Sequence, residues 1–184
     1  MQAIVKIEEK VVTGLIVPKW TNIYTHVIIV PPGVETIGPG AFSGCKRLSS
    51  ITLPNTLISV GSSAFKRCDG LRSLTLPEGL TSVGSYAFHR CTALTSITLP
   101  SSLTRHVGSY AFCDCRRLTS LTLPNGLTSL GYKIFQGCVR LTALTLPNTV
   151  NTIGNDAFQG CVSLTSLILP DVLTSIGFAA FKLH

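Results

Sequence analysis

Cysteine and histidine are the side chains in this sequence best suited to metal binding, disulfide formation or nucleophilic catalysis. A cysteine that recurs at one position of a repeat is expected to line the interior as a small, reduced, apolar side chain. A disulfide scaffold would instead pair different positions and would leave one of seven cysteines over. Six of the seven occupy one such position, three residues after a phenylalanine: Cys45, Cys68, Cys91, Cys115, Cys138 and Cys161.

The seventh cysteine, Cys113, falls outside this series, in the segment Cys113-Asp114-Cys115. A single Cys-x-Cys is a weak zinc signal, because a tetrahedral site needs two further ligands and none recurs nearby in the sequence. The pattern predicts that Cys113 is a partly exposed free thiol.

The remaining polar residues do not form a catalytic pattern. The eight acidic residues are dispersed, and Gly-x-x-Ala-Phe lacks the Lys-Ser/Thr of a phosphate-binding loop. None of the four histidines lies beside a recurring carboxylate or nucleophile: His26, His89, His106 and His184. The sequence predicts a protein that is not an enzyme, with no catalytic residue, no cofactor and no metal site.

The phenylalanines that precede the cysteines have a fixed spacing of 23 residues, with one step of 24. They are Phe42, Phe65, Phe88, Phe112, Phe135, Phe158 and Phe181. A period in the twenties with a Leu-x-x-Leu-x-Leu core is typical of a leucine-rich-repeat solenoid, in which each rung buries its apolar face only against its neighbours. Residues 28–184 are therefore expected to form seven rungs of one continuous domain, the last one partial.

The rung at 74–96 shows the elements expected in each repeat. Residues 74–76 alternate apolar and polar side chains, as a short strand does, and Pro77 closes that strand. Gly84 marks a sharp turn, and residues 85–88 are expected to form a single helical turn.

Two segments depart from the repeat. Residues 1–27 contain the first of two β-rich runs, 11–17 and 24–30, and are expected to form a hairpin-like cap over the first rung. The fourth rung has one extra residue near Arg105, which is either a tolerated loop insertion or a bulge on a binding face.

The repeats resemble the treponemal or BspA-like class of leucine-rich repeats, whose consensus is L-x-x-L-x-L-P-x-x-L-x-x-I-G-x-x-A-F-x-x-C. Residues 118–138 match it almost throughout, although Ile134 replaces the alanine. The resemblance implies a right-handed parallel β/α coil, with short strands on the concave side and single helical or 3-10 turns on the convex side. It also implies an interaction module of the kind found on cell surfaces.

The sequence shows no recognisable targeting segment. The chain is 45% hydrophobic and 12% charged, but charges interrupt its first ten residues, and no apolar run approaches the length of a membrane span. As written, the chain is expected to be intracellular; it would be at the cell surface if it is a fragment of a longer family member.

Basic residues cluster between each repeat phenylalanine and the next strand, and stacking should align them into a ridge. The ridge either keeps an apolar solenoid soluble or binds an acidic protein face, a sulfated glycan or an anionic lipid surface. Nucleic acid is disfavoured because no aromatic residues are interleaved to stack on bases. The candidate partner-binding residues, here called the basic ridge, are Lys46, Arg47, Lys66, Arg67, Arg90, Arg116 and Arg117.

A second candidate surface is the concave face of the strands, where serine and threonine recur. Such a ladder either stabilises the sheet or docks an extended ligand. Its central residues are Ser73, Thr75, Ser96, Thr98, Ser120 and Thr122.

Two functions follow from these surfaces. The first is a non-enzymatic protein-interaction module, with a role in adhesion or cell-surface recognition. The alternative is a structural subunit of a larger assembly, packed or self-associated through an uncapped C-terminal rung in which Leu169, Ile176 and Phe181 lack a following rung.

Overall fold

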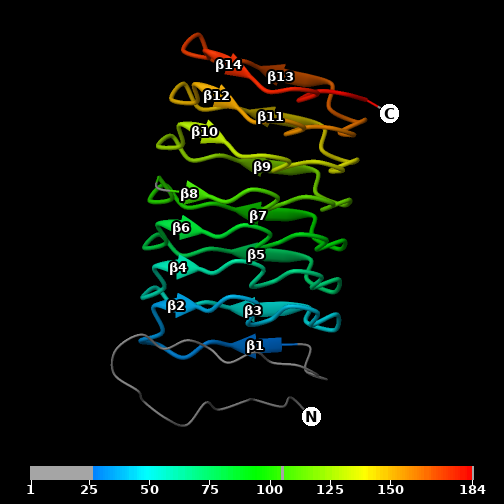
Figure 1. Ribbon diagram of the computed structural model, residues 1–184. Helices are drawn as coiled ribbons and strands as arrows, with labels where there is room; N and C mark the ends of the chain where they lie inside the picture. The colour runs from blue at the N-terminus through cyan, green and yellow to red at the C-terminus, as the bar shows by residue number, and fades with distance from the viewer. Residues whose placement is uncertain (1–26, 105, 184) are drawn as a thin grey trace.

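The protein forms a column of stacked rungs, each made of two short strands and the turns between them (Figure 1). The structure is a computed structural model and describes residues 27–104 and 106–183. One side of the column carries the three-residue strands β1 (Val27–Ile29), β3 (Ser50–Thr52), β5 (Ser73–Thr75), β7 (Ser96–Thr98), β9 (Ser120–Thr122), β11 (Ala143–Thr145) and β13 (Ser166–Ile168). The other side carries the two-residue strands β2 (Thr36–Ile37), β4 (Ser59–Val60), β6 (Ser82–Val83), β8 (His106–Val107), β10 (Ser129–Leu130), β12 (Thr152–Ile153) and β14 (Ser175–Ile176).

Strand pairing follows the repeat directly. On the first side β1 pairs with β3, and β5, β7, β9, β11 and β13 form one five-stranded parallel sheet. Each residue pairs with its equivalent in the next rung, as Ser73 does with Ser96 and Ser96 with Ser120. The repeat period of the sequence therefore sets the register of strand pairing, and the predicted solenoid architecture is confirmed.

The second side of the column differs from the expectation, because a narrow parallel sheet runs along it and the described residues contain no helix. The expected helical turn at 85–88 is not confirmed. The amide of Phe88 donates to the carbonyl of Ala111 in the next rung at 2.8 Å, and the amide of Tyr86 donates to Ser109 at 2.9 Å. Alternate amides thus bond between rungs and are not available to a helix within one rung.

The extra residue of the fourth rung coincides with a division of the narrow sheet. One part contains β2, β4, β6 and β8, and the other contains β10, β12 and β14. The inserted Arg105 itself lies outside the described residues, so the expectation of a bulge is not tested by them. The wider sheet continues past this rung without a break, from β7 to β9.

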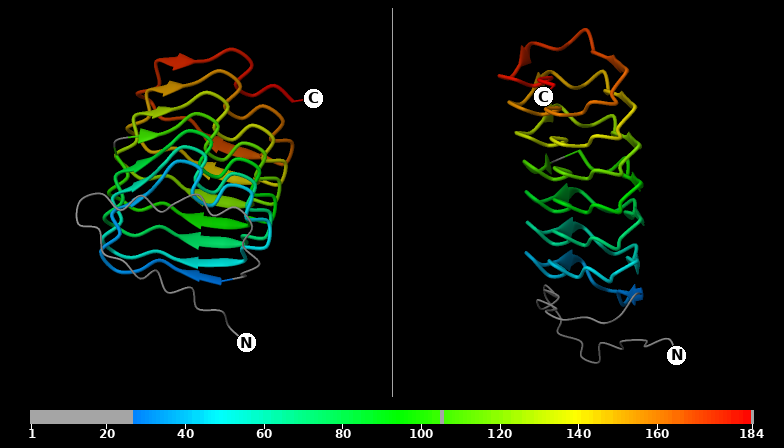
Figure 2. Two further views of the ribbon diagram at one scale, coloured as in Figure 1. Left: turned by 60° about the horizontal axis from the view of Figure 1, so that its bottom comes forward. Right: turned by 90° about the vertical axis from the view of Figure 1, so that its right-hand side faces the viewer.

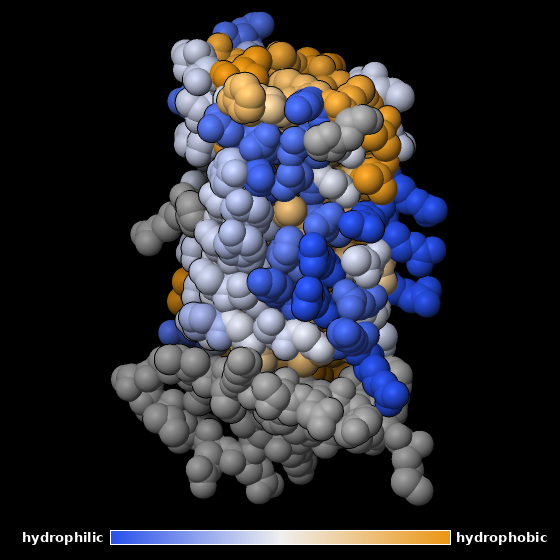
Figure 3. Space-filling model, turned by 45° about the vertical axis from the view of Figure 1, so that its right-hand side comes forward, coloured by the Kyte–Doolittle hydropathy of each residue, from blue (hydrophilic) through white to orange (hydrophobic). Residues whose placement is uncertain are grey.

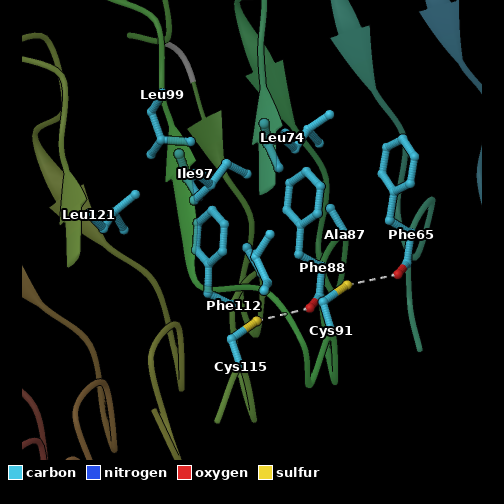
Figure 4. Close-up of a cluster of buried hydrophobic side chains, with 14 of the residues drawn as sticks. Phe65, Leu74, Ala87, Phe88, Cys91, Ile97, Leu99, Phe112, Cys115 and Leu121 are labelled. Atoms are coloured by element: carbon cyan, nitrogen blue, oxygen red, sulfur yellow. Dashed lines mark hydrogen bonds between the residues drawn. The ribbon is translucent and has the colours of Figure 1, made fainter. Parts of the chain in front are cut away.

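The phenylalanines form an unbroken stack through the centre of the column. Successive ring centroids lie 5.2–5.7 Å apart, and the rings are nearly parallel. The first six rings are buried, whereas Phe181 in the last rung is 37% exposed. Figure 4 shows Phe65, Phe88 and Phe112 pointing the same way from three successive rungs.

The six cysteines of the repeat are buried and reduced, as expected. Five of these thiols, those of Cys68, Cys91, Cys115, Cys138 and Cys161, also donate to the carbonyl of the phenylalanine in the preceding rung. The distance is 3.1 Å from Cys91 to Phe65 and 3.2 Å from Cys115 to Phe88 (Figure 4). Cysteine therefore fills a small apolar space and also supplies a weak donor between rungs. The sequence predicted the burial but not this bond.

At the N-terminal end of the described residues, Val27 belongs to β1 and pairs with Ser50 in a parallel arrangement. The end of the second β-rich run, 24–30, is therefore part of the first rung. The hairpin-like cap expected over residues 1–27 otherwise lies outside the described residues.

Candidate functional site

Part of the basic ridge surrounds a groove that spans four consecutive rungs. The groove has a volume of about 450 Å³ and is lined by Lys46, Arg67, Asp69, Arg90, Thr92, Asp114 and Arg116. Figure 3 shows hydrophilic side chains gathered in a band up this face of the column. The structure thus brings four of the seven ridge residues together around one hollow, whereas Arg47, Lys66 and Arg117 are not among its lining.

Two carboxylates, those of Asp69 and Asp114, also line the groove. Asp114 lies between two arginines, with its oxygens 3.3 Å from Nε of Arg90 and 3.5 Å from Nε of Arg116. Asp69 accepts a hydrogen bond of 3.5 Å from the hydroxyl of Thr92. No ion pair is found for Lys46 or Arg67 among the described residues, so the ion pairs of the groove lie in its third and fourth rungs.

The residues that follow the phenylalanines by two positions have an unusual backbone. Arg67, Arg90 and Asp114 all have φ near 59°. Glycine occupies the same position in the flanking rungs, at Gly44 and Gly137, with φ of 79° and 72°. The amide at this position bonds to the next rung, as that of Arg90 does to the carbonyl of Cys113 at 2.9 Å.

Sequence reasoning missed a tyrosine cluster near the ridge. The rings of Tyr86 and Tyr110 stack at 4.4 Å, and Tyr132 meets Tyr110 edge-on at 5.1 Å. Lys66 lies over the ring of Tyr86 at 5.5 Å, and Lys133 lies over that of Tyr132 at 5.1 Å. The signal was available in part, because Tyr86 and Tyr110 occupy one repeat position, two residues before the phenylalanine, and Tyr132 lies three residues before Phe135.

The serine and threonine candidates all lie on the exposed side of the wider sheet. In β5, β7 and β9 the outer residues are exposed and the central one is buried. This surface holds the exposed residues Ser73, Thr75, Ser96, Thr98, Ser120 and Thr122. The rungs rise as an almost straight column (Figure 2), so this face is a regular strip of short polar side chains beside the groove-bearing edge.

The prediction that Cys113 is partly exposed is wrong. Its side chain is 3% exposed, and its thiol donates to Oε1 of Gln136 at 3.7 Å. Burial, with a smaller effect of Asp114, raises the pKa of Cys113 to about 11, although Lys133 and Arg90 act in the opposite direction. The equivalent residues of the neighbouring rungs, His89 and Gln136, are only partly buried, and both have longer side chains than cysteine.

The last rung exposes large apolar side chains. Ile168 is 72% exposed, Phe178 is 82% exposed, and Leu183 is also exposed. Apolar residues accordingly gather over the last rungs, at the top of the column (Figure 3). A following repeat or another copy of the chain would cover such a surface.

The chain belongs to the BspA type leucine-rich-repeat family. The family's repeat region matches residues 20–106 and 105–184, in six copies. Proteins with this solenoid are typically non-enzymatic interaction scaffolds. No curated protein matches the chain by sequence.

Solved structures of bacterial leucine-rich-repeat proteins have the same fold. The chain is 31% identical to the T. pallidum leucine-rich-repeat protein, with a TM-score of 0.80 over 86% of this chain and 78% of that one. The chain is also 31% identical to a leucine-rich-repeat protein from Bacteroides ovatus, with a TM-score of 0.78. This match covers 83% of this chain and 39% of that one. A leucine-rich-repeat protein from Eubacterium ventriosum is 29% identical, with a TM-score of 0.73 and coverage of 85% and 42%.

The described residues contain no helix that is both long and apolar enough to cross a membrane.

Proposed function

We propose that the protein is an interaction module that binds the acidic face of a partner protein through the groove of the basic ridge. The observation that carries the proposal is the convergence of four basic side chains, one from each of four consecutive rungs, on one hollow. Such a cationic surface attracts acidic partners and accelerates their encounter. A sulfated glycan has similar charge and is the competing ligand in the test.

Charge reversal at Lys46 and Arg67, the groove cations for which no ion pair is found among the described residues, tests the proposal. In a Lys46→Glu/Arg67→Glu variant, binding to immobilised polyglutamate should weaken by about tenfold or more, because like charges then face each other. Binding of the unmodified protein should fall steeply as salt rises. Surface plasmon resonance over a salt series measures both effects.

The matched control is Arg72→Glu/Arg140→Glu, which makes the same change in net charge at exposed residues outside the groove. It should retain most of the binding. A Thr98→Arg/Thr122→Arg variant tests the wider sheet. Loss of binding only in this last variant, with little salt dependence, would place the site on the serine and threonine face. Heparin bound much more tightly than polyglutamate would favour a sulfated glycan.

A second candidate function, the structural subunit, is favoured by the exposed apolar residues of the last rung. Ile168 occupies the same repeat position as Thr145, and Phe178 occupies the same repeat position as Ser85. An Ile168→Thr/Phe178→Ser variant, which restores those residues, should convert a self-associated species to a monomer in multi-angle light scattering. Ile58→Thr, at an exposed residue of another rung, should have no such effect. An oligomeric state unchanged by the double variant would exclude this end as the contact.

A further inference from the structure

Three potential metal ligands from two adjacent rungs meet beside the groove. His89 follows Phe88 in the third rung, and Cys113 and Asp114 follow Phe112 in the fourth. A ring nitrogen of His89, the sulfur of Cys113 and a carboxylate oxygen of Asp114 all lie within 4.8 Å of one another. The sequence did not suggest this grouping, because His89 lies 24 residues before Cys113 and becomes its neighbour only through stacking.

An unsatisfied atom provides a second and independent observation. Nδ1 of His89 is shielded from solvent and has no hydrogen-bond partner. A buried polar atom without a partner costs about 1–3 kcal/mol, and in native proteins it generally has an explanation such as a bound ion. A metal ion would accept the lone pair of an imidazole nitrogen at this position.

We propose that His89, Cys113 and Asp114 form a zinc-binding site. One nitrogen, one thiolate and one carboxylate are ligands that Zn²⁺ combines in proteins, and three protein ligands leave a fourth position for water or for a group of a partner. Tetrahedral ligand atoms at normal bond lengths lie roughly 3.3–3.8 Å apart. The three ligand atoms therefore need to approach by roughly 1–1.5 Å. Asp114 also lines the groove, but the metal site does not depend on the function proposed for that groove.

The surrounding charges determine how the site would behave. Asp114 would exchange its bonds with Arg90 and Arg116 for the metal, while Lys66, Arg90 and Lys133 lie close enough to influence the triad. These cations repel the ion, while Arg90 and Lys133 favour the thiolate of Cys113. Burial, Lys66 and Arg90 lower the pKa of His89, whereas Asp114 and a backbone hydrogen bond to Cys113 raise it.

Titration of the folded protein with Co²⁺, followed by displacement with Zn²⁺, tests the site. Co²⁺ should give a thiolate-to-metal charge-transfer band and the visible absorption of a tetrahedral complex, with one ion per chain. Cys113→Ser should abolish the charge-transfer band. His89→Gln and Asp114→Asn should weaken Zn²⁺ binding by about tenfold or more. Glutamine is the residue of the fifth and sixth rungs at this position, at Gln136 and Gln159, and asparagine tolerates the backbone of Asp114.

Matched controls separate this site from other thiols and carboxylates. Cys161→Ser alters a cysteine of the buried ladder, and Asp156→Asn alters a carboxylate that lies 4.0 Å from Lys133. Both should bind the metal like the unmodified protein. A charge-transfer band that survives Cys113→Ser, or equal losses in the control variants, would overturn the proposal, as would the absence of Co²⁺ binding to the folded chain.

Discussion

Replacing Phe88 by alanine will lower the free energy of unfolding by about 3–5 kcal/mol, the range for removing a buried aromatic side chain from a packed core. Phe88 is fully buried, and its ring stacks on those of Phe65 and Phe112, each with centroids 5.4 Å away. The variant leaves a cavity that cannot collapse easily, because the strands on both sides hold the rungs at a fixed spacing. Urea denaturation followed by circular dichroism gives the change.

The control is Phe181→Ala in the last rung. This ring stacks on one neighbour only, Phe158, at 5.3 Å, and is 37% exposed. Its replacement should cost clearly less than that of Phe88. Equal losses at the two positions would contradict a core in which each rung is stabilised by neighbours on both sides.

Replacing Gly84 by alanine should also destabilise the protein, by about 1–3 kcal/mol, as overpacking does. A Cβ atom at Gly84 would lie 2.5 Å from the amide nitrogen of Ser62 and 2.8 Å from the carbonyl carbon of Gly61. Both contacts are with backbone of the preceding rung, which cannot rotate away as a side chain could. Thermal unfolding measured by calorimetry should show a lower midpoint.

Gly131 provides a matched control at the same repeat position. A Cβ atom there would meet its nearest neighbour, Ser109, at 3.4 Å, which is ordinary contact. Gly131→Ala should therefore be nearly neutral. If both substitutions cost the same, the effect would come from the turn itself and not from the close approach of two rungs.

The comparison of these two glycines shows where sequence reasoning was limited. Gly84 was interpreted as a sharp turn, but it does not have a positive φ. The structure instead requires glycine because two backbones approach each other there. Such a contact joins residues of different rungs, and a turn signal within one rung does not reveal it.

Likewise, the sequence predicted the position of each charge on the ridge but not which charges share a groove. Lys46, Arg67, Arg90 and Arg116 converge, whereas Arg117, which follows Arg116 directly, does not line the groove. Adjacent residues of a turn leave the backbone in different directions, and these directions depend on the folded backbone.

The sequence by itself determined the repeat, its register and the core. A side chain that recurs every 23 residues stacks on its own equivalents, and this period together with the apolar type of Phe88 and Cys91 predicts their burial. Only the tertiary structure decided the burial of Cys113 and its meeting with His89, since neither residue type recurs at that position. A period predicts contacts between like residues, whereas contacts between unlike residues depend on the side-chain directions that the folded backbone imposes.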